Sequence, residues 1–452
     1  MHLHILGISG TFMGGVALLA KQLGFQVTGS DKHIYPPMSQ QLIINNIKTN
    51  EGFLPRHIDK SVDFVLVGNI IQRGNESIEF TLSEQIPYLS GPEWLHRFVL
   101  KDRCVLAVAG THGKTTTSSL LAWILDHTGL NPGFLIGGIP ENFGVSARLG
   151  TGKYFVIEAD EYDTTFFDKR PKFLHYRPNI LILNNLEFDH ADIYPDIQAI
   201  QQQFHYLIRT VPGNGCLIHN QSDPNLKAVL AKGCWTPTKT FAGLDANWQS
   251  SLIVSDGSAF KVRYQNEEMG EVRWALLGQH NVNNALAALA AAYEVGVDMQ
   301  QAIESLSKFK PVKRRMEIKW QKNDVTFYDD FAHHPTAIAA TLNSLRQRVG
   351  SKSRLIAVLE FGSYTMRTGI HKSRLQEALK DADIVFCKNP KTDWGLQKIL
   401  QTFPQKSYSY DCTDRLVNQL VNMLQPGDHI ITMSSTAFDN IHQKIAKVLN
   451  KV

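Results

Sequence analysis

The chain has 452 residues, too many for a single hydrophobic core, so two to four domains are expected. Hydrophobic residues make up 43% of the chain and charged residues 19%, which is ordinary for a globular protein with ample apolar material to bury. The net charge of +4 is small for this length and gives no reason to expect a nucleic-acid partner. A mildly basic enzyme that acts on nucleotides and carboxylates fits these numbers, although they do not select it.

Five cysteines are scattered along the chain without any CxxC spacing, at Cys104, Cys216, Cys234, Cys387 and Cys412. That pattern argues against a disulfide framework or a zinc site and suits a reducing cytoplasm. The apolar start, residues 1–24, lacks a basic leader and is interrupted by glycines, unlike a signal peptide. No other apolar stretch approaches the roughly 20 residues that span a bilayer. We therefore predict a cytoplasmic protein without a membrane partner.

The first block begins with a short apolar strand at residues 3–6, which leads into a glycine-rich turn at 7–15. An amphipathic segment over 16–23 follows, then a second strand around 25–28 that ends near Asp31. A strand, glycine turn, helix, strand and acid in this order outline a Rossmann-type unit. The glycine spacing is not GxGxxG, so the turn does not indicate a dinucleotide site.

Later blocks also alternate between strands and helices. Further strands are predicted at residues 62–67, 104–109, 154–157, 180–183, 325–328, 354–359, 383–386 and 429–433, with a clear helix over 285–293 and a basic hinge at 310–315. Such alternation predicts parallel sheets. We predict an α/β fold with three domains: a Rossmann-like N-terminal domain (1–98), a central P-loop ATPase domain (99–311) and a Rossmann-like C-terminal domain (312–452).

The strongest functional motif is the run Gly110-Thr111-His112-Gly113-Lys114-Thr115-Thr116-Thr117, directly after the strand at 104–109. A glycine-rich turn between a strand and a helix lets backbone N–H groups close on phosphate oxygens. Lys114 supplies a cation for the β- and γ-phosphates, and the Thr115 hydroxyl can hold Mg²⁺. The GxxGKTT spacing is two residues tighter than that of common P-loops. A glycine turn with a chance lysine is the alternative, and the preceding strand opposes it.

Acidic residues follow the next predicted strand. Glu158-Ala159-Asp160-Glu161 stands where an acid reaches a metal beside a phosphate loop, although such a run can also be a solvated loop. His190 follows the strand at 180–183. A lone histidine is more often structural than a ligand, but its position at the carboxyl edge of a sheet makes it a candidate.

Three more segments contain polar residues at predicted element ends. Asn281 and Asn284 open the alanine-rich helix, where asparagines can bind a ligand or only cap the helix. The turn at 328–335 contains two acids and two histidines, and adjacent histidines do not face one metal. Arg315 can neutralise developing phosphate charge, or it can be a surface cation of the hinge.

Taken together, these segments resemble the Mur ligase family in its own order along essentially the whole chain: GTHGKTTT at 110–117, EADE at 158–161, NNLEFDH at 184–190, HNVNN at 280–284, RR at 314–315 and DDFAHHP at 329–335. The resemblance implies a first domain that binds the UDP part of a UDP-N-acetylmuramoyl substrate. It also implies a middle domain that binds ATP and a third domain that receives the incoming amino acid or peptide.

The resemblance also assigns roles to the matching residues. Lys114, His190, Arg315 and Asp330 would be catalytic, and Thr115, Glu158 and His190 would hold Mg²⁺. The residues that would bind ATP are Gly110, Thr111, His112, Gly113, Lys114, Thr115, Thr116, Asn281, Asn284, Arg315 and Asp330. Gly10, Thr11 and Asp31 would hold the UDP moiety, and the acceptor-side candidates are His333, His334 and Arg367.

Within the family, the chain resembles the alanine-adding branch in having no lysine at 201–205. Segments 7–15, 35–38, 91–95 and 184–194 resemble most the members that use the recycled tripeptide L-alanyl-γ-D-glutamyl-meso-diaminopimelate. Two turns differ from that relative: Phe361-Gly362 replaces Pro-Arg, and 433–438 replaces a Met-Ser-Asn-Gly-Gly-Phe segment. Both turns would face the acceptor peptide.

The resemblance thus implies an ATP-dependent ligase that joins UDP-N-acetylmuramate to the murein tripeptide through an acyl-phosphate, in peptidoglycan recycling. One alternative is a ligase that adds free L-alanine to the same sugar nucleotide by the same chemistry. A non-catalytic sensor of the sugar nucleotide is favoured only by the two altered turns. A Rossmann dehydrogenase leaves the phosphate loop unexplained.

Overall fold

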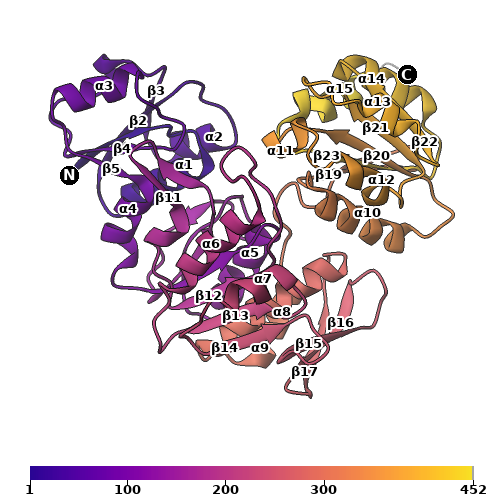
Figure 1. The fold of residues 1–452 in the computed structure, drawn as a ribbon, viewed down its shortest axis with the longest axis horizontal. Coiled ribbons are helices and arrows are strands. Elements are labelled where there is room, and N and C mark those ends of the chain that lie inside the picture. Colours follow the sequence, from indigo (N-terminus) through magenta and orange to yellow (C-terminus); the bar gives the residue numbers. More distant parts are fainter. Residues whose placement is uncertain (450–452) are drawn as a thin grey trace.

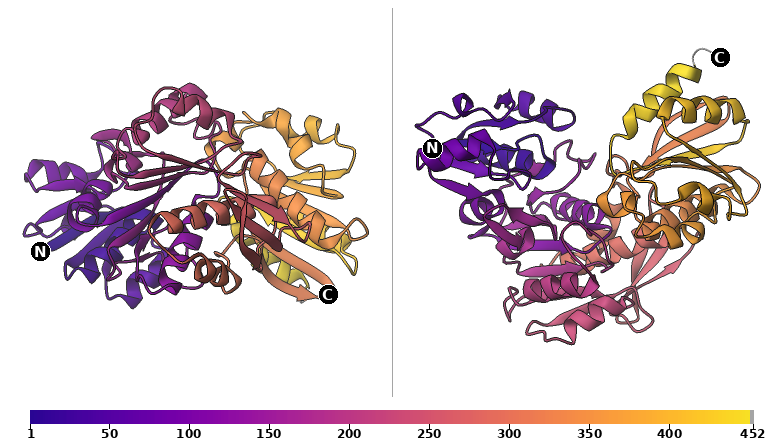
Figure 2. Two further views of the ribbon diagram at one scale, coloured as in Figure 1. Left: turned by 90° about the horizontal axis from the view of Figure 1, so that it is seen from below. Right: turned by 45° about the horizontal axis from the view of Figure 1, so that its top comes forward.

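The computed structural model describes residues 1–449, which form three α/β domains, each with its own sheet (Figure 1). The first and third domains extend as two arms from the middle domain (Figure 2). None of the helices within residues 1–449 combines the length and the apolar character needed to cross a membrane. The predicted three-domain α/β fold is confirmed, whereas the boundaries near residues 98 and 311 stay a prediction.

The first domain contains β1 (His2–Leu6), α1 (Thr11–Gln22), β2 (Gln26–Asp31), α2 (Met38–Ile44), β3 (Lys48–Glu51), η1 (Pro55–His57), β4 (Phe64–Val67), α3 (Glu76–Ser83), β5 (Tyr88–Ser90), α4 (Gly91–Leu95) and η2 (His96–Leu100). Its five strands are parallel in the order β3-β2-β1-β4-β5, the order found in Rossmann folds. Helix α1 begins earlier than the predicted residue 16. Gly14 and Gly15 lie inside the helix. A larger residue does not fit at either position, because a Cβ would come within 2.3 Å of Met38 at position 14 and of Leu135 at position 15.

The middle domain contains β6 (Cys104–Ala109), α5 (Lys114–His127), β7 (Gly133–Leu135), β8 (Ala147–Arg148), β9 (Tyr154–Ala159), β10 (Asp163–Thr165), β11 (Asp168–Pro171), η3 (Lys172–His175), β12 (Ile180–Leu183), α6 (Ile197–Ile208), β13 (Cys216–Asn220), α7 (Pro224–Leu230), β14 (Thr238–Phe241), β15 (Trp248–Leu252), β16 (Ala259–Tyr264), β17 (Glu267–Arg273), α8 (Gln279–Glu294) and α9 (Met299–Ser307). Its ten-stranded sheet has the order β17-β16-β15-β14-β13-β12-β6-β9-β7-β8. One face packs against α5, α8 and α9, and the other against α6, α7 and helices of the first domain.

The third domain contains β18 (Glu317–Lys322), β19 (Val325–Asp330), α10 (Pro335–Val349), β20 (Leu355–Glu360), α11 (Tyr364–Arg367), η4 (Lys372–Arg374), α12 (Leu375–Ala378), β21 (Ile384–Lys388), α13 (Leu396–Leu400), β22 (Lys406–Tyr410), α14 (Thr413–Met423), β23 (His429–Met433), η5 (Phe438–Asn440) and α15 (Ile441–Leu449). Its sheet has the order β18-β19-β23-β20-β21-β22. All neighbours are parallel except β18 and β19.

The predicted parallel sheets are confirmed, and antiparallel strands are added at the edges of the second and third sheets. Strands β15–β17, the pair β7–β8 and the pair β18–β19 are antiparallel. Two of these hairpins close through two-residue loops, Gln265-Asn266 and Asn323-Asp324, in which all four residues have positive φ. Such loops match the twist of paired strands and add an antiparallel strand without a helical crossover.

Candidate active site

The phosphate loop spans the four residues between β6 and α5. Gly110 and Gly113 adopt φ values of +140° and +80°, which glycine reaches without strain. Asn185, which follows β12, holds the loop: its carbonyl oxygen accepts from Thr111 N at 3.1 Å, and its Oδ1 accepts from His112 N at 2.7 Å. Asn185 therefore fixes the shape of the loop that leads into α5.

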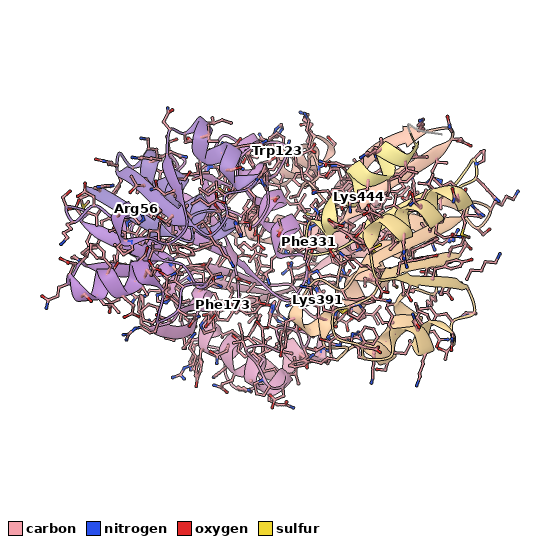
Figure 3. The ribbon with its side chains drawn as sticks, turned by 90° about the horizontal axis from the view of Figure 1, so that it is seen from above. Arg56, Trp123, Phe173, Phe331, Lys391 and Lys444 are labelled. Atoms are coloured by element: carbon pink, nitrogen blue, oxygen red, sulfur yellow. The ribbon has the colours of Figure 1, made fainter. Side chains whose placement is uncertain are left out.

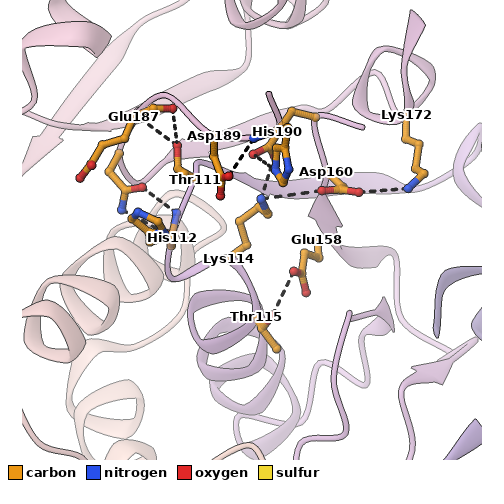
Figure 4. Close-up of polar contacts among 12 residues, drawn as sticks. Thr111, His112, Lys114, Thr115, Glu158, Asp160, Lys172, Glu187, Asp189 and His190 are labelled. Carbon is orange, nitrogen blue, oxygen red and sulfur yellow. Dashed lines mark hydrogen bonds and ion pairs between the residues drawn. The ribbon is translucent and has the colours of Figure 1, made fainter. Parts of the chain in front are cut away.

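Lys114 is the first residue of α5, and its ammonium lies among carboxylates (Figure 4). Its Nζ is 2.7 Å from Glu161 Oε2 and 3.8 Å from Asp160 Oδ1. Burial alone would lower the pKa of Lys114, but Glu161 and Asp160 outweigh burial and raise it. His190 Nε2 lies 3.1 Å from the other oxygen of Glu161, so this buried acid joins the lysine to the histidine. Lys114 is therefore a permanently charged cation at the base of the loop.

Thr115 and Glu158 provide oxygen atoms beside the loop. Thr115 Oγ1 donates to Glu158 Oε1 at 2.9 Å, and Gly137 N donates to Oε2 at 2.7 Å. Burial raises the pKa of Glu158. A hydroxyl and a carboxylate at this distance suit a hard cation such as Mg²⁺, which prefers oxygen ligands. The roles of Thr115, Glu158 and His190 as metal ligands stay a prediction.

Asn281 and Asn284 lie behind the phosphate loop on α8. Asn284 Oδ1 accepts from Thr117 Oγ1 at 3.1 Å, and Asn284 Nδ2 donates to Asn281 Oδ1 at 3.2 Å. Asn184 Nδ2 donates to the same Thr117 hydroxyl at 2.9 Å. The two asparagines of α8 do not cap that helix by a side-chain hydrogen bond, and they instead support the loop from within the domain. Their predicted contact with ATP is not tested by this arrangement.

Arg315 and Asp330 meet where the hinge enters the third domain. Asp330, at the end of β19, accepts from Met316 N and Ala332 N, each at 2.7 Å. Burial lowers the pKa of Arg315, while the carboxylates of Asp330 and Glu158 oppose that shift. The guanidinium lies 5.0 Å from the ring of Phe331, a residue at the junction of the middle and third domains (Figure 3). Arg315 is therefore a partly buried hinge residue near the carboxylates of Asp330 and Glu158, and its role toward ATP stays a prediction.

The acceptor-side candidates occupy three different settings. His333 Nδ1 lies 2.9 Å from the Phe331 carbonyl oxygen, and burial lowers the pKa of this histidine. His334 is buried and caps α10, where its Nδ1 accepts from Thr336 N at 3.3 Å. Arg367 is exposed at the C-terminal end of α11. The structure therefore brings the two histidines to the domain junction and leaves Arg367 near the surface.

A cavity of about 210 Å³ lies at the predicted UDP site. Gly10 and Thr11 of the first domain line it together with Lys172 of the middle domain. Asp31 does not line this cavity; its carboxylate accepts from Ser9 N at 2.8 Å and stabilises the glycine turn. Lys172 Nζ lies 3.0 Å from Asp160, whose other oxygen is near Lys114. Lys172 and Asp160 therefore connect the cavity to the phosphate loop.

Comparison with known proteins agrees with this architecture. Residues 2–103 match the Mur ligase family catalytic domain, residues 108–292 the Mur ligase middle domain, and residues 314–436 the Mur ligase glutamate ligase domain. The chain belongs to the Mur ligase family. It is therefore an ATP-dependent carbon–nitrogen ligase.

Individual Mur ligases match at different levels. The UDP-N-acetylmuramate–L-alanyl-γ-D-glutamyl-meso-2,6-diaminoheptandioate ligase of Escherichia coli (strain K12) is 51% identical over 452 residues, which is all of this chain and 99% of that protein. A murein peptide ligase structure from Psychrobacter arcticus has a TM-score of 0.77 at 43% identity, over 100% of this chain and 99% of that one. The UDP-N-acetylmuramate–L-alanine ligase of Dictyoglomus turgidum is 32% identical over 449 residues, covering 96% and 94% of the two chains.

The two turns of this Mur ligase that depart from the expected pattern lie against each other. A Cβ on Gly362, after β20, would come within 2.6 Å of Thr436, after β23. Glu360 accepts from Ser434 Oγ at 2.7 Å and from Thr436 Oγ1, and it pairs with Lys388 at 3.0 Å. Because β20 and β23 are neighbours, the two altered turns form one surface at the carboxyl edge of the third sheet.

Some residues of the site were not singled out from the sequence. Glu161 is the buried partner of Lys114, Asn185 holds the phosphate loop, and Lys172 reaches the cavity of the first domain. Glu161 and Asn185 stand inside motifs that were recognised, so proximity in sequence was a usable signal. Lys172 follows a short antiparallel pair of strands, β10–β11, and no recognised sequence motif includes this lysine.

Proposed function

We propose that this Mur ligase joins UDP-N-acetylmuramate to the tripeptide L-alanyl-γ-D-glutamyl-meso-diaminopimelate in peptidoglycan recycling, with ATP as the energy source. The observation that supports this acceptor is the 51% identity over the full chain with a ligase named for these substrates. The identity falls to 32% with a ligase named for free L-alanine. Both acceptors require the same chemistry, so the choice between them depends on the third domain.

The reaction has two steps. A carboxylate is a poor electrophile, and its oxygen is a poor leaving group. A carboxylate oxygen of the lactyl group first attacks the γ-phosphorus of ATP, the bond to ADP breaks, and an acyl-phosphate forms. The amine nitrogen of the peptide then attacks the acyl carbon, inorganic phosphate leaves, and the amine loses a proton to a base. ATP is therefore converted to ADP and phosphate for each amide bond formed.

Lys114 and Arg315 are the cations that face the transferred phosphoryl group in this proposal. Negative charge accumulates on the phosphoryl oxygens, and preorganised cations stabilise it without reorganising. Thr115, Glu158 and His190 would hold Mg²⁺, which neutralises phosphate charge when it is bound. Lys114 exchanges its contact with Glu161 for a phosphate oxygen, and Glu161 keeps its contact with His190.

The sugar nucleotide would extend from the first domain to the loop. Gly10 and Thr11 would contact the UDP part, and Lys172 at the other wall of the cavity would attract the anionic substrate. Asp160 is paired with Lys172 and lies near Lys114. The substrate would therefore pass Asp160 between the cavity and the γ-phosphate. This order suits a substrate whose two ends are bound by two domains.

His333 is the better candidate for the base that accepts the amine proton. Its Nδ1 faces the Phe331 carbonyl oxygen, which makes Nδ1 the protonated nitrogen and Nε2 the basic one. Burial lowers its pKa, so the ring is neutral at pH 7. His334 is less suited, because its Nδ1 caps α10 and its Nε2 is buried.

The deciding experiment supplies the purified enzyme with ATP, Mg²⁺, UDP-N-acetylmuramate and either the tripeptide or L-alanine. We expect phosphate release and a coupled product with the tripeptide. Release with L-alanine and none with the tripeptide would instead select the alanine ligase. Release with neither, together with tight binding of the sugar nucleotide, would select a sensor. We also propose a cytoplasmic location, where ATP is available, and domain divisions near residues 98 and 311.

A further inference from the structure

Three histidines from two domains meet beside the phosphate loop. The His112 ring, in the loop, lies 4.7 Å from the His334 ring at the start of α10, and His371 lies 4.5 Å from His334 on its other side. His334 is 1% exposed and His371 is 7% exposed. In each of the three rings Nε2 is buried and has no hydrogen-bond partner among residues 1–449. A buried polar atom without a partner is destabilising, and a ligand to that atom supplies the missing contact.

Glu187 brings a carboxylate to the same place. One ligand atom from each of His112, Glu187 and His334 can be chosen so that all three lie within 4.8 Å of one another. Glu187 Oε2 also accepts from Thr336 Oγ1 at 2.7 Å and lies 3.3 Å from an Arg374 nitrogen. Such outer partners orient a carboxylate toward a metal and are a usual part of metal sites.

We propose that His112, His334 and Glu187 form a binding site for a divalent transition metal, with Zn²⁺ as the best-fitting ion. Two imidazoles and one carboxylate are a known three-residue ligand set for zinc, which leaves a fourth position open. Imidazole suits Zn²⁺, Cu²⁺ or Ni²⁺, whereas Mg²⁺ prefers oxygen, so this site differs in kind from the one at Thr115 and Glu158. The scattered cysteines do not bear on a site without thiolates.

The electrostatic setting leaves both imidazoles available. Burial is the main cause that lowers the pKa of His112, and burial lowers the pKa of His334 to about 4. Both rings are therefore neutral at pH 7, which is the form that binds a metal. The Glu187 carboxylate brings negative charge, and Arg374 pairs with it at 3.3 Å from the side of the third domain.

The ligands come from the middle domain, through His112 and Glu187, and from the third domain, through His334. A bound metal therefore joins the two domains and stabilises their contact. We expect Zn²⁺ to raise the thermal stability of the protein and to slow turnover, because it opposes the separation of the arms that releases product. This site is independent of the proposed acceptor, since zinc binding is measured without any substrate.

The test is a Zn²⁺ titration of the full chain against a chromophoric chelator, without nucleotide. It is done in a Glu158→Gln background, which weakens the oxygen site beside the loop. We expect one Zn²⁺ per chain. His334→Asn keeps a side chain that caps helices well and removes the imidazole, and Glu187→Gln removes the charge. Each should weaken binding by at least the ~10–100-fold typical of losing an outer-shell partner.

The matched control is His33→Asn, which removes an exposed histidine of the first domain and should leave zinc affinity unchanged. Absence of bound Zn²⁺ in the Glu158→Gln protein, or unchanged affinity in His334→Asn, overturns the proposal. Circular dichroism in chelator checks that each variant is folded. If a variant does not fold, the visible spectrum of Co²⁺ bound to the Glu158→Gln protein decides: an intense four- or five-coordinate spectrum supports the site, and a weak octahedral one refutes it.

Discussion

At the scale of single residues, the pair of Lys114 and Glu161 is the most consequential contact of the site. Both side chains are largely buried, with 11% and 2% exposed, and their atoms are 2.7 Å apart. Removing one partner of a buried pair leaves the other charge without compensation, whereas the intact pair contributes little net stability. The contact therefore serves to hold a cation ready for phosphate.

We predict that Lys114→Ala will lower product formation by about 10²–10³-fold, because a preorganised cation is lost from the phosphoryl group. The free energy of unfolding should also fall by about 3–5 kcal/mol, because Glu161 stays buried without its lysine. Phosphate release and urea denaturation measure the two effects. Lys114→Arg is the control, since it keeps the charge and should restore most of the stability. Full product formation by Lys114→Ala would falsify the proposed role.

A second prediction concerns Asn284, which can act on ATP or only on the loop. Asn284→Ala leaves the Thr117 hydroxyl and Asn281 each without one partner, so stability should fall by about 1–3 kcal/mol. If the asparagine acts only by supporting the loop, the changes in kcat and in KM for ATP, converted to free energies, will be smaller than the change in the free energy of unfolding. Steady-state kinetics and thermal melts separate the cases, with Asn283→Ala on the same helix as the control. A large rise in KM with unchanged stability would show direct contact with ATP.

The sequence predicted these residues unevenly, for physical reasons. Lys114, Thr115 and Glu158 were predictable because strand ends in a parallel sheet meet at one edge. The acid that pairs with Lys114 was not, since Glu158, Asp160 and Glu161 are chemically alike. Glu158 is still in β9 and bonds Thr115, whereas the path of the backbone after β9 directs Glu161 to the lysine.

At the scale of secondary-structure elements, Gly113 of the phosphate loop can be compared with Gly129, which lies after α5 and has a similar φ. A Cβ on Gly113 would lie 2.5 Å from Asn284 Oδ1, in addition to the strain of φ +80°. Gly129 has nearly the same φ, +81°, and no atom lies within 4 Å of the position that a Cβ would occupy there. The two glycines thus differ only in what surrounds them.

We predict that Gly129→Ala will cost only the left-handed strain of about 1–2 kcal/mol and will leave ATP binding intact. Gly113→Ala should cost more than that and should weaken ATP binding by about tenfold or more, equivalent to at least ~1.4 kcal/mol, because the loop must shift away from Asn284. Calorimetric titration with ATP and thermal melts provide both numbers. Equal effects of the two substitutions would contradict the role of the loop contact.

Elements were predictable from the sequence where burial was complete. Strands β6, β12 and β23 match their predicted bounds because continuous apolar runs in the middle of a parallel sheet are unambiguous. The hairpin β16–β17 was missed because its residues alternate with charged ones and its turn, Gln265-Asn266, lacks glycine. The long helix α8 was predicted, although it begins earlier, at Gln279, than the alanine-rich pattern indicated.

At the scale of the whole molecule, the two arms are attached differently. One hydrophobic core contains residues of both the first and the middle domain, such as Met13 and Leu183. The cores of the third domain, within residues 1–449, contain no residue of the other two domains. The third domain is therefore the arm that can move as a unit when substrates bind.

Helix α10 contacts the middle domain at both of its ends. Thr336 near its start donates to Glu187, and Arg348 in its last turn lies 3.2 Å from Asp256 of the middle domain. Arg374 adds a second ion pair with Glu187 at 3.3 Å. Both arginine side chains are about half exposed, so each pair contributes only about 0–1 kcal/mol and is screened by salt.

We predict that Arg348→Met combined with Arg374→Met will shift the molecule toward a more open arrangement without unfolding any domain. Two weak pairs together change the equilibrium by up to about 2 kcal/mol, which is enough to alter the population of the closed form. The radius of gyration from X-ray scattering should rise, kcat should fall, and the response of both to added salt should be smaller than in the unmodified protein. Lys380→Met is the control because its ion pair with Glu377 lies within the third domain. An unchanged radius of gyration, with kcat still sensitive to salt, would mean that these two ion pairs do not determine closure.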